Sequence, residues 1–215
     1  MLQTFQSGAK VVSGSATLML LVLMGLVFGA FSEGYDRLSI AHLLRNFPFA
    51  EVTEFTPVIV FGLLGALGIL LALGVVMLAE RLVDTDSARQ LARALSAITL
   101  LIMICVLVFA WSGSLWVAIG IYVVMQPLRS LIGPLTMAWF NRNLPSSSRA
   151  TVISMHSQAD ALGQIAGGPG VGLLGRELGL RLAIATAGLL LLPALWLYGR
   201  VRDNTVFEQD QGSAD

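Results

Sequence analysis

Charged residues are scarce in this 215-residue chain. Lys, Arg, Asp and Glu together make up 12% of it, and their formal charges sum to zero. Soluble domains carry roughly 25% charged residues. Because no net positive charge is available to neutralise phosphates, nucleic-acid binding has no electrostatic basis. Hydrophobic residues make up 56% of the chain, and the mean hydropathy is +0.80, which is typical of a protein embedded in a lipid bilayer.

Cysteine and histidine are equally rare. The single cysteine, Cys105, lies in an apolar run, so it excludes an internal disulfide and is expected to pack as a small hydrophobe. The two histidines, His42 and His156, are far apart and have no neighbouring cysteines or carboxylate cluster. We therefore expect neither a metal site nor a cofactor.

Long apolar runs dominate what remains. Stretches of roughly 20 residues can cross about 30 Å of hydrocarbon, and the chain has six of them. The predicted fold is an all-α membrane protein whose transmembrane domain covers residues 1–202, followed by a polar tail, residues 203–215, that we expect to be disordered. The expected spans are Val11 to Phe31, Pro57 to Ala79, Leu95 to Trp111, Leu115 to Trp139, Thr151 to Leu174 and Leu182 to Tyr198.

The basic residues predict an orientation. With the N-terminus in the cytoplasm, the inner segments hold Lys10, Arg81, Arg89, Arg93, Arg142, Arg149, Arg200 and Arg202, and the outer segments hold Arg37, Arg45, Arg176 and Arg181. This distribution of eight against four favours both termini in the cytoplasm.

Polar residues on the fourth and fifth expected spans fall on single helical faces at 100° per residue. We expect the third and sixth spans, which are nearly uniform hydrocarbon, to face lipid. The sequence FSEGYDRL continues a face of the first span with Glu33 and Asp36. The polar arc of the fourth span holds Tyr122, Gln126, Arg129, Ser130 and Gly133; that of the fifth holds His156, Ser157, Asp160, Gln164 and Gly167, beside a stripe of small residues at Ser154, Ala161, Gly168 and Gly172.

Charged groups inside the bilayer need shelter. A charge at the bilayer centre costs at least about 2.5 to 3.5 kcal/mol, so Arg129 and Asp160 should face protein or water within a shared cavity. The alternative is that they pair between helices or reach an interface. His156 is either a proton carrier or a hydrogen-bonded packing residue. Glu33 and Arg37 are expected to form a solvated pair near a membrane edge.

Glycines recur at four-residue spacing. Gly25 and Gly29, and Gly163 and Gly167, would allow two helix backbones to approach closely. The run from Gly167 to Gly170, which includes Gly168 and Pro169, weakens a helix in mid-span and suits either a hinge or a rigid kink.

One region resembles a known family. The run from Asn141 to Ala183 is similar to the tenth-to-eleventh helix region of major facilitator superfamily exporters, particularly the bacterial drug-efflux group of tetracycline and macrolide resistance proteins, and FSEGYDRL resembles their seventh helix. The resemblance implies helices seven to twelve, one half of the fold, with helices nine and twelve outside the substrate path. The matching residues are Arg149, Ala150, Thr151, Ser154, Gly167, Gly168, Pro169 and Gly172.

The resemblance is incomplete. In the loop MLAERLVDTDSARQLARAL, only Arg81, Asp84, Arg89 and Arg93 match a cytoplasmic signature of the superfamily. A complete transporter has two six-helix halves, and this chain has one. We expect a fragment whose N-terminal six-helix half is missing; the alternatives are a half-size protein that pairs with a separate chain or with itself, and an inactive remnant.

The expected function is therefore that of the C-terminal half of a secondary active transporter in the plasma (inner) membrane. It would export small amphipathic molecules in exchange for protons, and it would not be an enzyme. Residues expected along the substrate path are Tyr122, Gln126, Arg129, Ser130, Ser157 and Gln164; candidates for proton coupling are Asp160, His156, Glu33 and Asp36.

Two other classes compete with this hypothesis. A membrane assembly or scaffold protein would keep the glycine stripes but would not need Arg129 and Asp160 in mid-span. An intramembrane serine protease would need a serine and a histidine facing each other, and Ser114 in WSGSLW lacks the expected G-x-S-G context.

Overall fold

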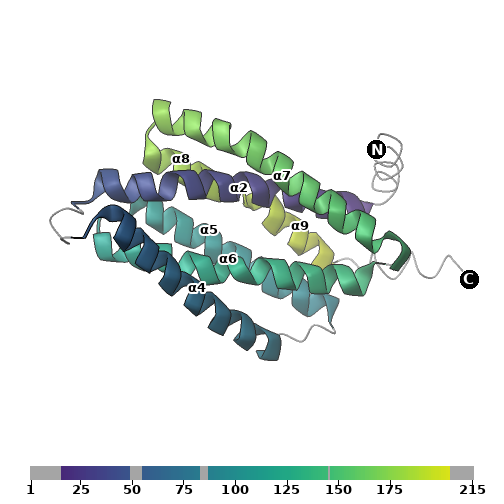
Figure 1. Ribbon diagram of the computed structural model, residues 1–215. Coiled ribbons are helices and arrows are strands. Elements are labelled where there is room, and N and C mark those ends of the chain that lie inside the picture. The colour runs from purple at the N-terminus through teal and green to yellow at the C-terminus, as the bar shows by residue number, and fades with distance from the viewer. Residues whose placement is uncertain (1–15, 49–54, 83–86, 145, 204–215) are drawn as a thin grey trace, which may run out of the picture.

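The computed structural model describes residues 16–48, 55–82, 87–144 and 146–203, which are helical apart from short connections (Figure 1). The all-α prediction is confirmed for these residues. The helices are α2 (Ala16–Asn46), α4 (Pro57–Leu82), α5 (Ala88–Trp111), α6 (Leu115–Asn143), α7 (Ser146–Glu177), α8 (Leu180–Leu189) and α9 (Leu192–Asp203). Of the tail expected to be disordered, only Asp203 belongs to the described part.

Among the described residues, four helical segments are long and apolar enough to cross a membrane, which fits a multi-pass membrane protein. They lie in α4, α5, α6 and the consecutive pair α8 and α9. The helices α2 and α7, with 31 and 32 residues, are longer than any of these but are not among the four. The segments are Pro57–Ala79, Arg89–Trp111, Leu115–Asn141 and Leu180–Gly199.

The last of these segments is broken into two helices rather than forming the single helix that we expected. α8 ends at Leu189, and Leu190 donates its N–H to Thr186 and Ala187 in a closing turn. Pro193 then lies in the first turn of α9, where its missing N–H leaves no intrahelical bond unmade.

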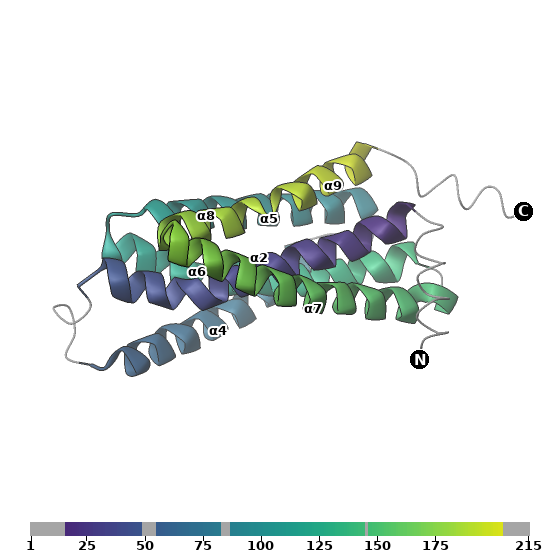
Figure 2. The same cartoon turned by 90° about the horizontal axis from the view of Figure 1, so that it is seen from above.

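Successive passes through the bundle run in opposite directions. Figures 1 and 2 show α2 and α7 side by side, with α8 behind them and α5 between α6 and the α8–α9 pair. α4 lies at one edge and packs chiefly against α6. Contacts of α6 with α2 and α7 are few, so a gap separates these elements on one side of the bundle.

The hydrophobic core lies between α5 and the helices packed around it, and some of its side chains also line the gap. Two clusters of buried side chains run along α5, one around Leu95 and Trp139 and the other around Ile102 and Phe109. Cys105 is partly buried against the second cluster. α5 is therefore anchored in the bundle on several sides.

α4 is the most exposed helix of the bundle. We had expected the third and sixth spans, which lie in α5 and in the α8–α9 pair, to face lipid instead. Only 11% of its apolar span is buried, compared with 39% for α5 and 44% for α8 and α9. The physical reason is topological: α4 has one main neighbour, whereas α5 packs against α6, α8 and α9. Uniform hydropathy showed that a helix is apolar but not whether lipid or protein covers it.

The backbones of α2 and α7 are in direct contact through glycines. A Cβ added to Gly29 would lie 2.0 Å from the Asp160 carbonyl oxygen, and one added to Gly163 would lie 2.1 Å from that of Leu26. At Gly167 an added Cβ would lie 2.5 Å from Ala30 Cα. Such distances exclude any side chain, so these positions hold the two helices together at close range.

The stripe of small residues beside the polar arc is not the main contact of α7 with α2. An added Cβ at Gly172 would meet nothing within 4 Å, and Ser154 and Ala161 are exposed. Gly168 packs under the Glu33 side chain. The face of α7 that packs on α2 therefore includes the backbone at Asp160, because Gly29 of α2 lies opposite it. α7 also continues unbroken through Pro169, which is exposed.

Candidate functional site

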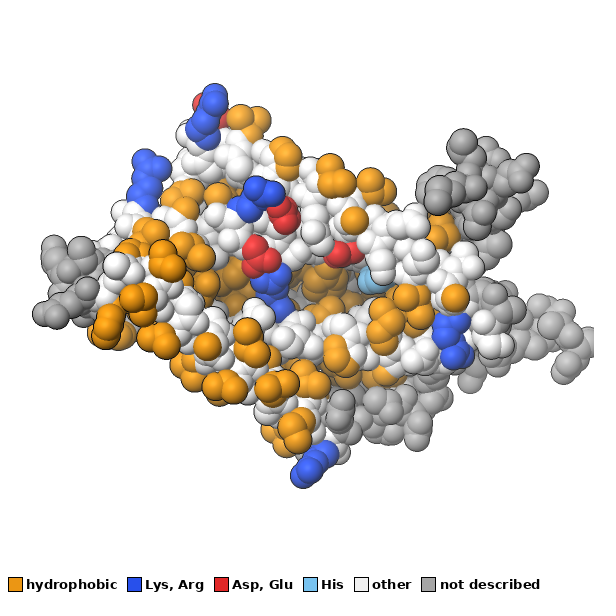
Figure 3. All heavy atoms as spheres, viewed as in Figure 1, with side chains coloured by type: hydrophobic (Ala, Val, Ile, Leu, Met, Phe, Trp, Pro, Cys, Tyr) orange, Lys and Arg blue, Asp and Glu red, His pale blue; other side chains and the backbone are white. Residues whose placement is uncertain are grey.

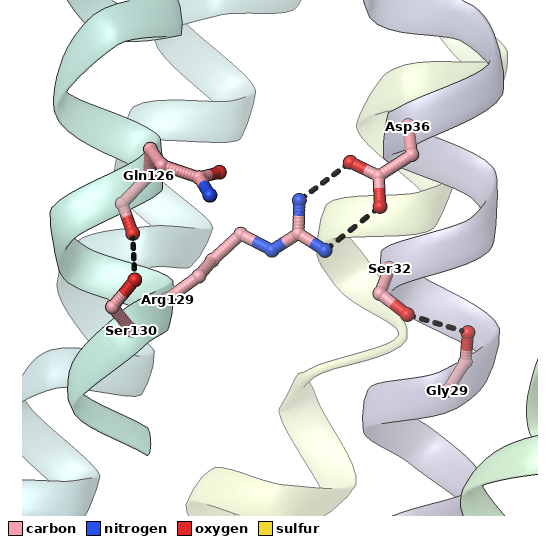
Figure 4. A network of polar contacts seen from close by, with 6 residues as sticks. All are labelled: Gly29, Ser32, Asp36, Gln126, Arg129 and Ser130. Atoms are coloured by element: carbon pink, nitrogen blue, oxygen red, sulfur yellow. Dashed lines mark hydrogen bonds and ion pairs between the residues drawn. The ribbon is translucent and has the colours of Figure 1, made fainter. Parts of the chain in front are cut away.

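A two-pronged ion pair joins α6 to α2 across the gap. Arg129 Nη1 lies 2.5 Å from Asp36 Oδ1, and Nη2 lies 2.8 Å from Oδ2 (Figure 4). The side chain of Arg129 is 24% exposed and that of Asp36 is 53% exposed, so water or a bound molecule in the gap can contact the pair. Parallel bonds from a guanidinium to a carboxylate fix both orientation and distance.

Two aromatic rings complete the surroundings of this arginine. The guanidinium carbon of Arg129 lies 5.9 Å from the ring centroids of both Phe31 and Tyr35. The two rings are one helical turn apart on α2, and both lie close to the guanidinium that Asp36 binds. A cation near aromatic faces gains further electrostatic stabilisation, which helps to hold Arg129 in the gap.

Two hollows lie in the gap, and together we call them the groove. The first, of about 230 Å³, lies between α2, α6 and α7, and the second, of about 300 Å³, lies between α2, α4 and α6. Figure 3 shows acidic, basic and histidine side chains gathered along this depression. Arg129 lines both hollows; Phe28, Phe31, Phe140, His156 and Asp160 line the first, and Asp36, Tyr122 and Gln126 line the second.

The part of the groove formed by α7 depends on the glycine contact. Because Gly29 leaves room for the Asp160 backbone, α7 approaches α2 closely enough for Asp160 and His156 to line the first hollow. Gln164 Nε2 donates to Asp160 Oδ2 over 2.8 Å, one turn further along α7. The His156 ring packs edge-on against Phe140 of α6, with centroids 5.2 Å apart.

Three residues expected along the path line neither hollow. The hydroxyl of Ser130 donates to the Gln126 carbonyl oxygen, and that of Ser157 donates to the carbonyl oxygen of Ile153. Gln164 reaches the groove only through Asp160. Serine hydroxyls in helices commonly bond to the preceding turn in this way. Their polarity is thus partly used within their own helix.

The carboxylates expected to couple protons differ in their partners. Glu33 forms the expected ion pair with Arg37 one turn further along α2, in which Arg37 is 68% exposed and Glu33 is 23% exposed. Asp36 pairs with Arg129. Within the described ranges, Asp160 has Gln164 as its hydrogen-bond partner and forms no ion pair.

The arginines expected in cytoplasmic loops lie at the ends of helices. Arg149 donates from Nη2 to the carbonyl oxygens of Asn141 and Leu144, so it ties the start of α7 to the end of α6. Arg81 and Arg89 are exposed. Asp84 lies outside the described residues. The role found for Arg149 is structural, because it satisfies carbonyl groups at a helix C-terminus.

The partner of Arg129 and the aromatic residues around it were not predicted from the sequence. Asp36 was expected near a membrane edge, but α2 continues to Asn46 and brings it level with Arg129. The signal that could have found the site is the spacing of Phe31 and Tyr35, one turn apart and next to Asp36. Among the described residues, no group of three or more His, Cys, Asp or Glu could hold a metal ion.

Comparison with known proteins adds no relative. No family model matches the chain, and searches of curated proteins and of solved structures found no significant match. The functional proposal below is therefore supported by the groove and its residues.

Proposed function

We propose that the chain forms one six-helix half of a secondary active transporter of the major facilitator type, and that the groove is its side of a path for small amphipathic molecules. The observation that carries this proposal is the concentration of charged and amide side chains in one groove of an otherwise apolar bundle. A second six-helix bundle, from another chain or a second copy, completes the path.

The energetics of the groove support a partner or water in front of it. Asp36, Arg129 and Asp160 would each cost at least about 2.5 to 3.5 kcal/mol at the centre of a bilayer if lipid covered them. Pairing between Asp36 and Arg129 offsets part of this cost, but Asp36 remains half exposed. An aqueous path between two bundles removes the remaining penalty.

The order of the helices around the groove supports the same proposal. The first, second, fourth and fifth passes, which are α2, α4, α6 and α7, supply nearly all of its lining, and α9 adds only Tyr198. The resemblance noted above places the corresponding family helices around the substrate path. In the proposed six-helix half, α2 and α7 cross the membrane together with the four apolar segments.

Coupling to protons is assigned to Asp160. It lines the first hollow, one turn from His156, and its carboxylate accepts a neutral amide hydrogen bond rather than an arginine. Asp36, by contrast, is held by Arg129 through both of its carboxylate oxygens. The two bundles would rock around this site, and protonation of Asp160 would favour one of the two states.

Orientation in the plasma membrane is part of the proposal. α2 begins and α9 ends at the same end of the bundle as Arg81, Arg89, Arg93 and Arg149 (Figure 1). By the positive-inside rule, this positive charge supports an orientation with that end, and with it both termini, in the cytoplasm.

Transport by the chain as it is isolated from membranes, with any chain that copurifies, tests the proposal. In proteoliposomes, an imposed pH gradient should drive the movement of a fluorescent amphipathic dye, and Asp160→Asn should reduce its rate at least tenfold. Glu177→Gln, which removes a carboxylate from the end of the same helix, should leave the rate unchanged. Equal rates for all three proteins, or no gradient-driven movement by the wild type, would contradict the proposal.

A further inference from the structure

A second cluster of charge lies away from the groove, at the corner where α2 ends and α7 turns into α8. A hollow of about 340 Å³ at this corner has three arginines around it: Arg45, Arg176 and Arg181. Figure 3 shows basic side chains at this end of the bundle. The transport proposal uses none of these residues.

The local backbone brings the arginines together. Gly179 has φ of +94°, a conformation that side chains rarely adopt, and it closes the short turn between α7 and α8. As a result, Arg176 in the last turn of α7 and Arg181 in the first turn of α8 border one hollow, which Arg45 reaches from the last turn of α2.

Positive charge at this corner is incompletely balanced. Arg176 pairs with Glu177 over 3.0 Å, but no ion pair to Arg45 or Arg181 occurs among the described residues. Arg181 also lies at a helix N-terminus, where a cation is electrostatically unfavourable. An anion in the hollow would relieve both the repulsion between the arginines and this unfavourable placement.

Apolar side chains border the cluster. Leu178 lines the hollow and is 59% exposed, and Leu44 and Leu182, which adjoin Arg45 and Arg181 in sequence, are 42% and 44% exposed. In a membrane-spanning bundle this corner lies at the level where lipid headgroups meet acyl chains. Arginine is suited to phosphate because its planar fork donates two parallel hydrogen bonds.

We propose that this corner binds a phosphate group, with Arg45 and Arg181 as its principal ligands. The group can belong to the headgroup of an anionic phospholipid or to a free phosphate ion. The inference is independent of the transport function, because the hollow shares no lining residue with the groove.

Thermal unfolding of the full chain in phosphate-free detergent provides the test, since a ligand that binds the native state raises Tm with its concentration. The probes are a short-chain phosphatidylglycerol, inorganic phosphate, and a short-chain diacylglycerol that lacks phosphate. The variants are the double substitution Arg45→Gln with Arg181→Gln, and a matched control, Arg89→Gln with Arg93→Gln, which removes two exposed arginines from the start of α5.

We expect at least one phosphate-bearing probe to raise the Tm of the wild type and the control variant, while diacylglycerol does not. The Arg45 and Arg181 double variant should bind that probe about tenfold more weakly or worse, because each charge-assisted hydrogen bond contributes substantially to binding. A response to phosphatidylglycerol alone identifies a lipid headgroup, and a response to inorganic phosphate identifies the free ion. Equal weakening in both double variants, or no response to either probe, would overturn the proposal. The Tm of each variant without probe shows whether it is folded.

Discussion

Arg129 is the residue on which the groove depends most. It lines both hollows, bonds to Asp36 through both nitrogens and lies near two aromatic rings. Few other contacts join α2 to α6, so this ion pair is a main polar link between them. Its partial exposure means that water or a bound molecule can weaken it.

A double-mutant cycle should measure this link. With Asp36→Asn and Arg129→Gln, singly and together, we expect a coupling free energy of about 1 kcal/mol, since solvent screening of a half-exposed carboxylate limits the gain. Reversible unfolding in mixed micelles provides the measurement. The same cycle on Arg176 and Glu177, both more exposed, should give no measurable coupling. Equal coupling in the two cycles would show that the pair across the gap has no special role.

At this scale the sequence predicted residue types better than partners. Arg129 and Asp160 were expected in a shared cavity because apolar surroundings make charged groups costly, and both line the first hollow. His156, expected to be either a proton carrier or a packing residue, lines the same hollow. The bond to Asp36 was not predictable, because 93 residues separate the two positions and helical periodicity describes only one helix at a time. Asp84 stays a prediction, since it lies outside the described residues.

The contact between α2 and α7 is the element-scale feature that shapes the groove. Gly29, Gly163 and Gly167 remove the side chains that would separate the two backbones, and the resulting approach places Asp160 beside α2. The four-residue glycine spacing was visible in the sequence. Which glycines would face a partner was not, because that depends on how the second helix lies.

A pair of glycine substitutions on α7 distinguishes packing from helix propensity. Gly163→Ala should destabilise the fold by about 1 to 3 kcal/mol, because the new Cβ would lie 2.1 Å from a backbone oxygen and the helices must separate. Gly172→Ala should be neutral or stabilise it by up to about 1 kcal/mol, since an added Cβ there meets nothing and alanine favours a helix. Unfolding free energies in mixed micelles provide the comparison. A neutral Gly163→Ala would contradict the close approach.

Helix boundaries were predictable where composition changes sharply, as at Pro57, Trp111 and Leu115. The prediction was wrong for the last pass, which is two helices, and it ended the first pass at Phe31 although α2 continues to Asn46. In both cases hydropathy did not reveal the helix boundary. The leucines of the last pass are apolar on both sides of the break, and the extension of α2 is polar yet helical.

At the scale of the whole molecule, the bundle has two unlike sides. α5, α8 and α9 lie on the side of the buried clusters, whereas α2, α4, α6 and α7 border an open groove with charges in it. α4, with 11% of its span buried, has apolar surface available for lipid or for a second bundle. The proposal of a transporter half rests on water reaching the groove and not the outer faces.

Accessibility of single cysteines to a membrane-impermeant thiol reagent tests this claim most directly. In a Cys105→Ala background, Ser32→Cys and Gln126→Cys report on the groove, and Leu70→Cys and Ile104→Cys report on exposed apolar positions of α4 and α5. Right-side-out and inside-out membrane vesicles expose both ends of the path. We expect both groove cysteines to react from at least one side and both apolar positions to stay unmodified. Groove cysteines as unreactive as the two apolar controls in both vesicle types would contradict a water-filled path.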